Sequence, residues 1–163
     1  MAKGVLVALF LAALVAVTLP GCGEEGAAGG ATVTVYVSAP MGGPEMKAGR
    51  QLCDGARDEA ARQGEVEGLR LKVICLDATE GGGRWTLAQV GANARRATED
   101  STAIAYVGEP DPEARRQSRP IVDAAGIAQL AGMTGREAVA RVWAAIADGD
   151  ESEPRRAVFD AEG

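Results

Sequence analysis

The sequence contains no histidine among its 163 residues. Without an imidazole, the chain cannot build the Ser-His or Cys-His pair in which histidine activates a nucleophile. It also lacks the nitrogen ligand that many zinc sites use, so a metal site would have to consist of carboxylates alone. We therefore expect a protein that is not an enzyme and that carries no cofactor and no metal.

An excess of positive charge is also missing. The chain has 17 Lys and Arg residues against 23 Asp and Glu residues, which gives a formal net charge of −6. A protein of this sign is repelled by phosphate backbones and by anionic lipid surfaces. The composition therefore argues against nucleic acid as a partner, and against binding to an anionic membrane surface through charge.

Long apolar runs are scarce, and the exception is at the N-terminus. Lys3 precedes about 16 uncharged residues, Val5 to Pro20, which is short for the roughly 30 Å core of a bilayer and typical of a signal peptide. The run leads into Leu-Pro-Gly-Cys, the pattern of a bacterial lipobox, in which small residues before the cysteine admit the peptidase. We expect residues 1–21 to be a lipoprotein signal peptide and Cys22 to be lipidated. An ordinary secretion signal, with Cys22 unmodified, is the alternative.

Cysteine is rare, with three residues in the chain. If Cys22 carries lipid, Cys53 and Cys75 remain as an even pair. A secreted chain meets an oxidising compartment, where such a pair is expected to form a disulfide. Two buried free thiols are the alternative.

The residues after the signal peptide predict a tether followed by one α/β domain. Residues 22–32 are mostly Gly, Ala and Glu, with too little apolar surface to pack, so we expect a flexible tether. From Val33 on, apolar runs typical of buried strands alternate with segments of helical periodicity. The expected strands are 33–40, 68–78, 102–108 and 126–132, and the helices between them are 47–64, 84–100 and a helix that Asp111 caps and Pro112 begins. This alternation predicts a three-layer sandwich with an open parallel sheet of about four strands in flavodoxin-like order.

The C-terminal residues predict two further helices. Val139, Val142, Trp143 and Ile146 recur at helical spacing, and the first helix should end at Gly149. Ser152 and Pro154 can begin a second, short helix. Because the helices before residue 126 leave part of the sheet uncovered, we expect the apolar face around Trp143 to pack against it.

Three stretches of this sequence are similar to a known family. They are "VTVYVSAPMGGPEMKAGRQLCDGARDEAARQG", "ICLDATEGGGRWTLAQVGANARRATEDSTAIAYVGE" and "SRPIVDAAGIAQLAG", and they resemble the type I periplasmic binding proteins, specifically the branched-chain amino acid (Leu/Ile/Val) binding components of ABC transporters. The resemblance implies a periplasmic-binding-protein-like first lobe over residues 33–132, with residues 133–163 as helices that return to the same lobe. Family members have two such lobes with the ligand between them, so the resemblance predicts a chain reduced to its first lobe.

The candidate ligand-binding residues lie in loops at the carboxyl ends of the expected strands, where open parallel sheets bind ligands. The resemblance implies that loops 108–113 and 131–135 hold the carboxylate and amino groups of an amino acid. In this chain the first of these loops carries Glu109, Asp111 and Glu113, which would repel a carboxylate, so a ligand that presents an amine is expected. The alternative is that Asp111 only caps the following helix and Glu113 complements its dipole.

Three further side chains are candidates at the same edge of the sheet. Ser38 and Thr134 offer hydroxyl groups for a ligand contact, although turn and cap roles suit them equally well. Asp77 follows the second strand and either lines the ligand cleft or binds the turn after it. The ligand-binding candidates are therefore Ser38, Asp77, Glu109, Asp111 and Thr134.

Two functions are compatible with these features. The first is a solute-binding lipoprotein of an ABC-type amino acid uptake system, or a truncated descendant of one, which captures a small molecule (an amino acid or an amine) and docks to an ABC permease without chemistry of its own. The second is a membrane-tethered single-lobe interaction domain that has lost ligand binding. Both place the protein outside the cytoplasm, held by a lipid anchor on a bacterial cell membrane, in the periplasm or on the cell surface.

Overall fold

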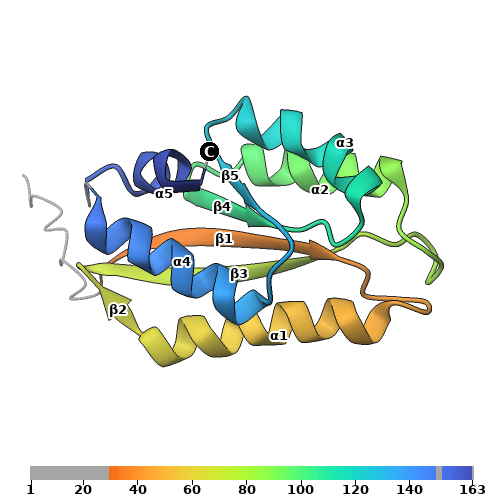
Figure 1. The fold of residues 1–163 in the computed structure, drawn as a ribbon, viewed down its shortest axis with the longest axis horizontal. Coiled ribbons are helices and arrows are strands. Elements are labelled where there is room, and N and C mark those ends of the chain that lie inside the picture. The colour runs from red at the N-terminus through yellow and green to blue at the C-terminus, as the bar shows by residue number, and fades with distance from the viewer. Residues whose placement is uncertain (1–29, 150–151, 163) are drawn as a thin grey trace, which may run out of the picture.

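A computed structural model of the chain describes residues 30–149 and 152–162 (Figure 1). Strands and helices alternate along the chain, as the sequence predicts: β1 (Ala31–Ala39), α1 (Met46–Gln63), β2 (Glu65–Val66), β3 (Leu69–Asp77), α2 (Leu87–Thr98), β4 (Ala103–Val107), α3 (Pro112–Asp123), β5 (Ala128–Leu130), α4 (Gly135–Asp148) and α5 (Pro154–Glu162). The expected signal peptide and Cys22 lie outside the described residues. Within the part that is described, none of the helices is both long enough and apolar enough to cross a bilayer.

The sheet confirms the predicted α/β class and strand order. Its five strands follow one another in the order β2-β3-β1-β4-β5. β3, β1, β4 and β5 are parallel, and they run second, first, third, fourth along the chain, which is the flavodoxin-like order. The fifth strand, β2, is antiparallel to β3 and has two residues. A strand this short carries no sequence periodicity, which is why four strands were expected.

The element boundaries differ from the prediction by up to three residues. β1 begins at Ala31, two residues into the predicted tether, because its first residues already pair with β3 at Leu69. β5 is limited to Ala128–Leu130. Asp111 caps α3 with Pro112 at its first position, as predicted, and α3 continues through Pro120. Helix α2 begins at Leu87, three residues after the predicted start at residue 84, because Thr86 is its N-cap. The cap at Asp111 is recognisable locally, because a proline follows it, whereas strand ends depend on a distant partner.

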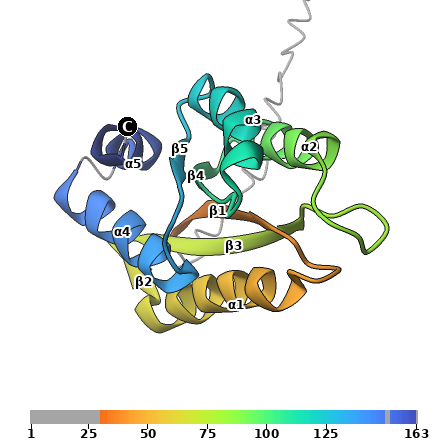
Figure 2. The same ribbon diagram turned by 45° about the vertical axis from the view of Figure 1, so that its right-hand side comes forward.

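Helices cover both faces of the sheet (Figures 1 and 2). α1 and α4 lie on one face and α2 and α3 on the other, while α5 packs beside β4 and β5. Successive side chains of β1 point to opposite faces of the sheet. Val35 and Val37 pack in the core under α1 and α4, and Tyr36 packs in the core under α2 and α3. The predicted three-layer sandwich is therefore confirmed.

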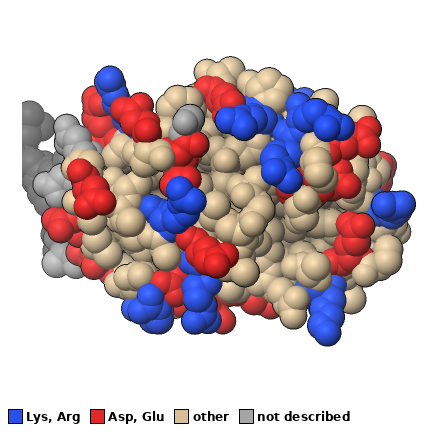
Figure 3. Space-filling view, viewed as in Figure 1, with Lys and Arg blue, Asp and Glu red and all other residues tan. Residues whose placement is uncertain are grey.

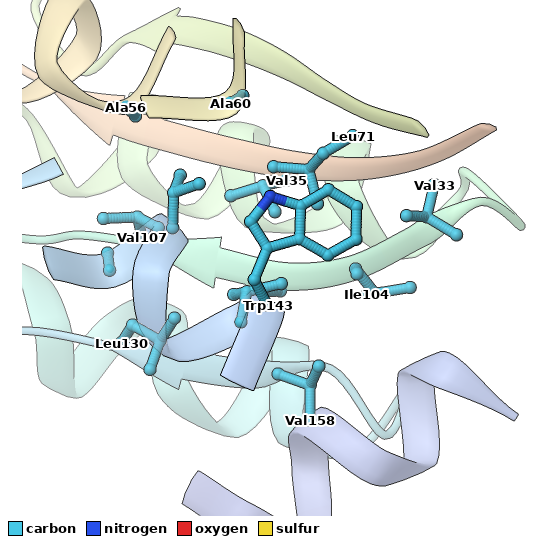
Figure 4. Packing of buried hydrophobic residues seen from close by; sticks show 14 of the residues in the cluster. Val33, Val35, Ala56, Ala60, Leu71, Ile104, Val107, Leu130, Trp143 and Val158 are labelled. Carbon is cyan, nitrogen blue, oxygen red and sulfur yellow. The ribbon is translucent and has the colours of Figure 1, made fainter. Parts of the chain in front are cut away.

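Helix α4 packs against the sheet, as its apolar face predicts. Val139, Val142, Trp143 and Ile146 are all buried, and Trp143 is 4% exposed. Figure 4 shows the indole of Trp143 among side chains of β1, β3, β4 and α1. α4 also crosses α1 closely at Gly135, where a Cβ atom would collide with a carbonyl oxygen of α1. Helices α4 and α5 thus pack with the same sheet as the elements before them.

The predicted disulfide between Cys53 and Cys75 is present. Its Cα atoms are 5.9 Å apart, within the range of about 4.4 to 6.8 Å that a disulfide needs. Cys53 belongs to α1 and Cys75 to β3, so the bond ties the first helix to the sheet.

Candidate functional site

A cavity of about 370 Å³ opens at the carboxyl edge of the sheet. It lies between the first half of α1 and the loops that follow β4 and β5. Cavities that bind small molecules usually measure about 300 to 1,000 Å³. Its lining is mainly apolar: Ala48, Gln51, Leu52, Val107, Gly108, Glu109, Pro110, Leu130, Ala131, Gly132, Met133 and Thr134.

A larger cavity, of about 520 Å³, lies at the opposite, amino-terminal edge beside α5. Arg155 in its wall donates to three main-chain carbonyl oxygens, those of Asp100, Ser101 and Ala103, at 2.7 to 3.2 Å. These bonds hold α5 on the sheet, so the arginine already has a structural role. Because open parallel sheets bind ligands at their carboxyl ends, the smaller cavity is the candidate site.

Charge is mixed on the face of the molecule that Figure 3 shows. On the face drawn in Figure 3, Lys and Arg side chains alternate with Asp and Glu side chains around stretches of uncharged surface. A surface that bound a polyanion would gather one sign of charge. The face drawn in Figure 3 therefore shows no patch of a single charge.

Of the described residues that line the cavity, Glu109 is the ionisable one, but its carboxyl group is buried on the side of the sheet that α2 and α3 cover. It follows β4 and is 1% exposed, and the hydroxyl of Tyr106 donates to its Oε1 atom at 2.9 Å. Burial raises the pKa of Glu109 to about 7, although hydrogen bonds from the hydroxyls of Ser38 and Tyr106 act in the opposite direction. The carboxyl group is thus a buried acid that changes charge near neutral pH.

Ser38 lies near the end of β1 and is fully buried, and it is not among the residues that line the cavity. Its Oγ atom accepts a hydrogen bond of 2.9 Å from the side-chain amide of Asn93. The same amide nitrogen donates to the carbonyl oxygen of Asp77 at 2.9 Å. Asn93 in turn accepts a bond of 3.0 Å from Gln89. Ser38 is therefore part of a buried polar network that joins β1, β3 and α2 beside Glu109.

Asp77 joins the two loops that follow β1 and β3. Its Oδ1 atom accepts bonds from the main-chain N–H of Met41 at 2.9 Å, and from the N–H and hydroxyl of Thr79, both at 2.8 Å. Burial would raise the pKa of Asp77, but these hydrogen bonds outweigh it and hold the pKa below its ordinary value. Asp77 thus binds the turn after it, and it is not among the residues that line the cavity.

Asp111 and Thr134 cap the two helices that begin near the cavity. Asp111 accepts from the N–H groups of Glu113 and Ala114, at 2.8 and 3.3 Å. Thr134 forms a capping box with Glu137, in which each side chain accepts from the other residue's main-chain N–H. Thr134 also lines the cavity, whereas Asp111 does not.

The sequence did not predict two groups of residues near the site. Leu52 and Gln51 of α1 and Met133 of the loop after β5 line the cavity, because the fold brings α1 beside that loop. Asn93 of α2 donates to Ser38 and to the carbonyl oxygen of Asp77, at the carboxyl ends of β1 and β3. A signal for Asn93 exists in the sequence, since it is a polar residue on the buried face of α2, and such residues usually serve as hydrogen-bond partners.

Comparisons with known proteins give a fold. No family model matches the sequence, and no curated protein matches it. Solved structures do match. A leucine-binding protein from Thermotoga maritima has a TM-score of 0.53 at 21% identity, over 61% of this chain and 27% of that one. A putative branched-chain amino acid ABC transporter protein from Rhodospirillum rubrum has 0.54 at 20%, over 61% and 28%.

A third solved structure widens the range of ligands among the similar proteins. It is an ABC transporter solute-binding protein from R. palustris in complex with 4-hydroxybenzoate, with a TM-score of 0.54 at 19% identity, over 61% of this chain and 26% of that one. The matched part thus spans about a quarter of each of these proteins. The chain has the fold of about one lobe of a type I periplasmic binding protein, the fold of the leucine and branched-chain amino acid binding proteins of ABC transporters.

Proposed function

We propose that this chain is a solute-binding lobe of an ABC-type uptake system, which captures an amino acid or an amine in the carboxyl-edge cavity. The observation that carries the proposal is the position of that cavity. It lies at the carboxyl ends of β4 and β5 and has the size of a small-molecule site. Its wall combines an apolar surface with few polar side chains, among them Gln51 and Thr134, which is the composition expected of such a site.

The proposed role is capture without chemistry, followed by docking to an ABC permease. The similar solved structures are solute-binding proteins of ABC transporters, and this supports the role as a proposal for our chain. We further propose that lipid on Cys22 anchors the protein outside the cytoplasm. The disulfide between Cys53 and Cys75 supports this location, because structural disulfides are rare in reducing compartments.

Ligand binding is expected to be weak. The described residues form one wall of the site, and one wall cannot close over a solute by a hinge motion. A bound amino acid would keep part of its surface in water, so less apolar area is buried than in a closed cleft. We expect free amino acids to bind more weakly than about 1 mM, the level at which the binding free energy is about −4 kcal/mol.

Ligand-observed NMR tests the proposal at such affinities. Saturation transfer from the protein to leucine, isoleucine, valine and lysine should be saturable. Ala48→Trp, which places an indole in the cavity wall, should abolish transfer. Ala61→Trp is the matched control, because Ala61 is also exposed on α1 but lies away from this cavity.

Two results would contradict the proposal. Transfer that persists unchanged in Ala48→Trp would place binding elsewhere on the molecule. If none of the solutes in the panel receives saturable transfer, the proposal of solute capture is wrong. A membrane-tethered interaction domain would then be favoured.

A further inference from the structure

The wall of the carboxyl-edge cavity presents no charged group to a solute. Apart from Glu109, the described residues that line it have uncharged side chains. The carboxyl group of Glu109 is buried and accepts from the hydroxyl of Tyr106, on the side of the sheet that α2 and α3 cover. The cavity itself is lined by α1 and by the loops after β4 and β5. A solute there would therefore meet neither a carboxylate nor a cation among these lining residues.

Two polar side chains of the wall, those of Thr134 and Gln51, are neutral. The hydroxyl of Thr134 donates to the carboxylate of Glu137 at 2.9 Å and accepts from the main-chain N–H of Glu137 at 3.2 Å, so the capping box already uses it. Gln51 is exposed on α1, and its amide takes part in none of the hydrogen bonds among the described residues. An amide both donates and accepts, so Gln51 can bind an uncharged polar group.

Charged residues that are close in sequence to the lining lie outside it. Lys47 precedes Ala48 on α1 and is exposed. Glu137 is bound to Thr134 and lines a neighbouring hollow together with Arg141. These side chains leave the wall of the cavity itself without charge of either sign.

We propose that the cavity recognises the apolar body of a solute and selects against charge of either sign, so that an uncharged solute binds more tightly than an ammonium ion or a carboxylate of the same shape. This inference rests on the proposed function and names the ligand class of the same site. The apolar body contacts Leu52, Leu130 and Met133, and the amide of Gln51 receives the polar end. A free amino acid carries both charges, which agrees with the weak binding expected of it.

The selectivity follows from the loss of water around the solute. Moving an ionised group from water to an apolar wall without an opposite charge costs much more free energy than moving an amide or a hydroxyl group. This cost has the same sign for cations and for anions. A fixed charge in the wall would instead favour one of them and repel the other. Solutes of both signs, each compared with a neutral counterpart, therefore test the inference.

Two pairs of solutes separate charge from shape. 4-Methylpentanamide and 4-methylpentanoate have nearly the same shape, and so do 3-methylbutanol and 3-methylbutylamine. The carboxylate and the amine are both ionised at about pH 7. We would titrate all four into the wild-type protein and follow the main-chain amide signals of Gly108 and Gly132, which line the cavity. The neutral member of each pair should bind at least about fivefold more tightly than the charged member.

A charge introduced at Gln51 should change this selectivity. Gln51→Glu should strengthen the binding of 3-methylbutylamine, and Gln51→Lys that of 4-methylpentanoate. Each gain should be about two- to fivefold, because an exposed ion pair is weak. Gln117→Glu is the matched control, since it makes the same chemical change at an exposed position of α3, on the other face of the sheet. It should bind all four solutes like the wild type.

The outcomes distinguish this inference from the proposed function. If the two members of each pair bind equally, or if the charged member binds more tightly in either pair, the inference is wrong while solute capture stands. If both Gln51 variants bind like the control, the position assigned to the polar end of the solute is wrong. If none of the four solutes shifts the cavity signals, the inference and the proposed function are both wrong.

Discussion

Replacing Glu109 by glutamine should stabilise the folded protein at pH 8 and leave its stability almost unchanged at pH 5. The carboxyl group is 1% exposed, and burial moves its pKa from the ordinary value of 4.5 to about 7. One pKa unit corresponds to about 1.4 kcal/mol. Ionised Glu109 therefore costs the folded state on the order of 3 kcal/mol, and the variant should gain most of this at pH 8.

The sign follows from proton binding. Between pH 4.5 and about 7 the folded protein holds a proton on Glu109 that the unfolded chain has released, so the free energy of unfolding falls as pH rises through this window. It becomes level above about pH 7.5. The glutamine side chain is neutral at every pH, and its amide oxygen can still accept from Tyr106. The free energy of unfolding of the variant should therefore not fall between pH 5 and pH 8.

Other acids do not disturb this window. Hydrogen bonds lower the pKa values of Glu59, Asp77, Asp100 and Glu137 below their ordinary values. Acids of this kind add stability as pH rises, and that gain is complete once the unfolded-state carboxyls have ionised, near pH 5. A decline between pH 5 and 8 thus reports on Glu109.

Urea unfolding followed by circular dichroism measures the effect. The unfolding free energies of wild type and Glu109→Gln would be compared at pH 5 and pH 8 at constant ionic strength. Asp111→Asn serves as the control and should follow the wild type. A wild-type stability that stays within about 1 kcal/mol between the two pH values would refute a buried, uncompensated carboxyl group, and so would a variant destabilised equally at both.

Three further predictions concern the anchor, the disulfide and the core. Cys22→Ser should release the protein from bacterial membranes or leave an uncleaved precursor in fractionation; wild-type protein that is soluble with an unmodified Cys22 would contradict the lipid anchor. The double variant Cys53→Ala/Cys75→Ala should lose about 3 kcal/mol of unfolding free energy, because the bond joins residues 22 apart; equal urea midpoints with and without reductant in the wild type would contradict this. Trp143→Ala should lower the free energy of unfolding by about 3 to 5 kcal/mol. Trp143→Phe should lower it by less than about 2 kcal/mol, because the buried indole N–H of Trp143 makes no hydrogen bond with the described residues. Equal losses for the two variants in urea unfolding would contradict this packing.

Local sequence signals predicted much of the fold. Asp111 and Pro112 marked the start of α3, and the spacing of Val139, Val142 and Trp143 marked the buried face of α4. These features depend on neighbours along the chain. β2 was missed and β1 was predicted too short, because strand limits depend on pairing with residues far away in the sequence.

The candidate site was predictable only in part. Loops after parallel strands pointed to Glu109 and Thr134, which line the cavity. The burial of Ser38 and its bond to Asn93 required the packing of α2 on the sheet. The contribution of Leu52 required the crossing of α1 with the start of α4, which Gly135 permits by its lack of a side chain. Such contacts join separate elements, so no short stretch of sequence predicts them.

The central claim is that the lobe holds a solute in the carboxyl-edge cavity, and mapping the binding site on the wild-type protein by NMR tests it most directly. During titration with leucine and 3-methylbutylamine, the amide signals of residues 108–109 and 131–134 should shift together and saturate. Shifts centred on Gly126 and Arg155, beside the amino-edge cavity, or no saturable shift with either solute, would contradict the claim.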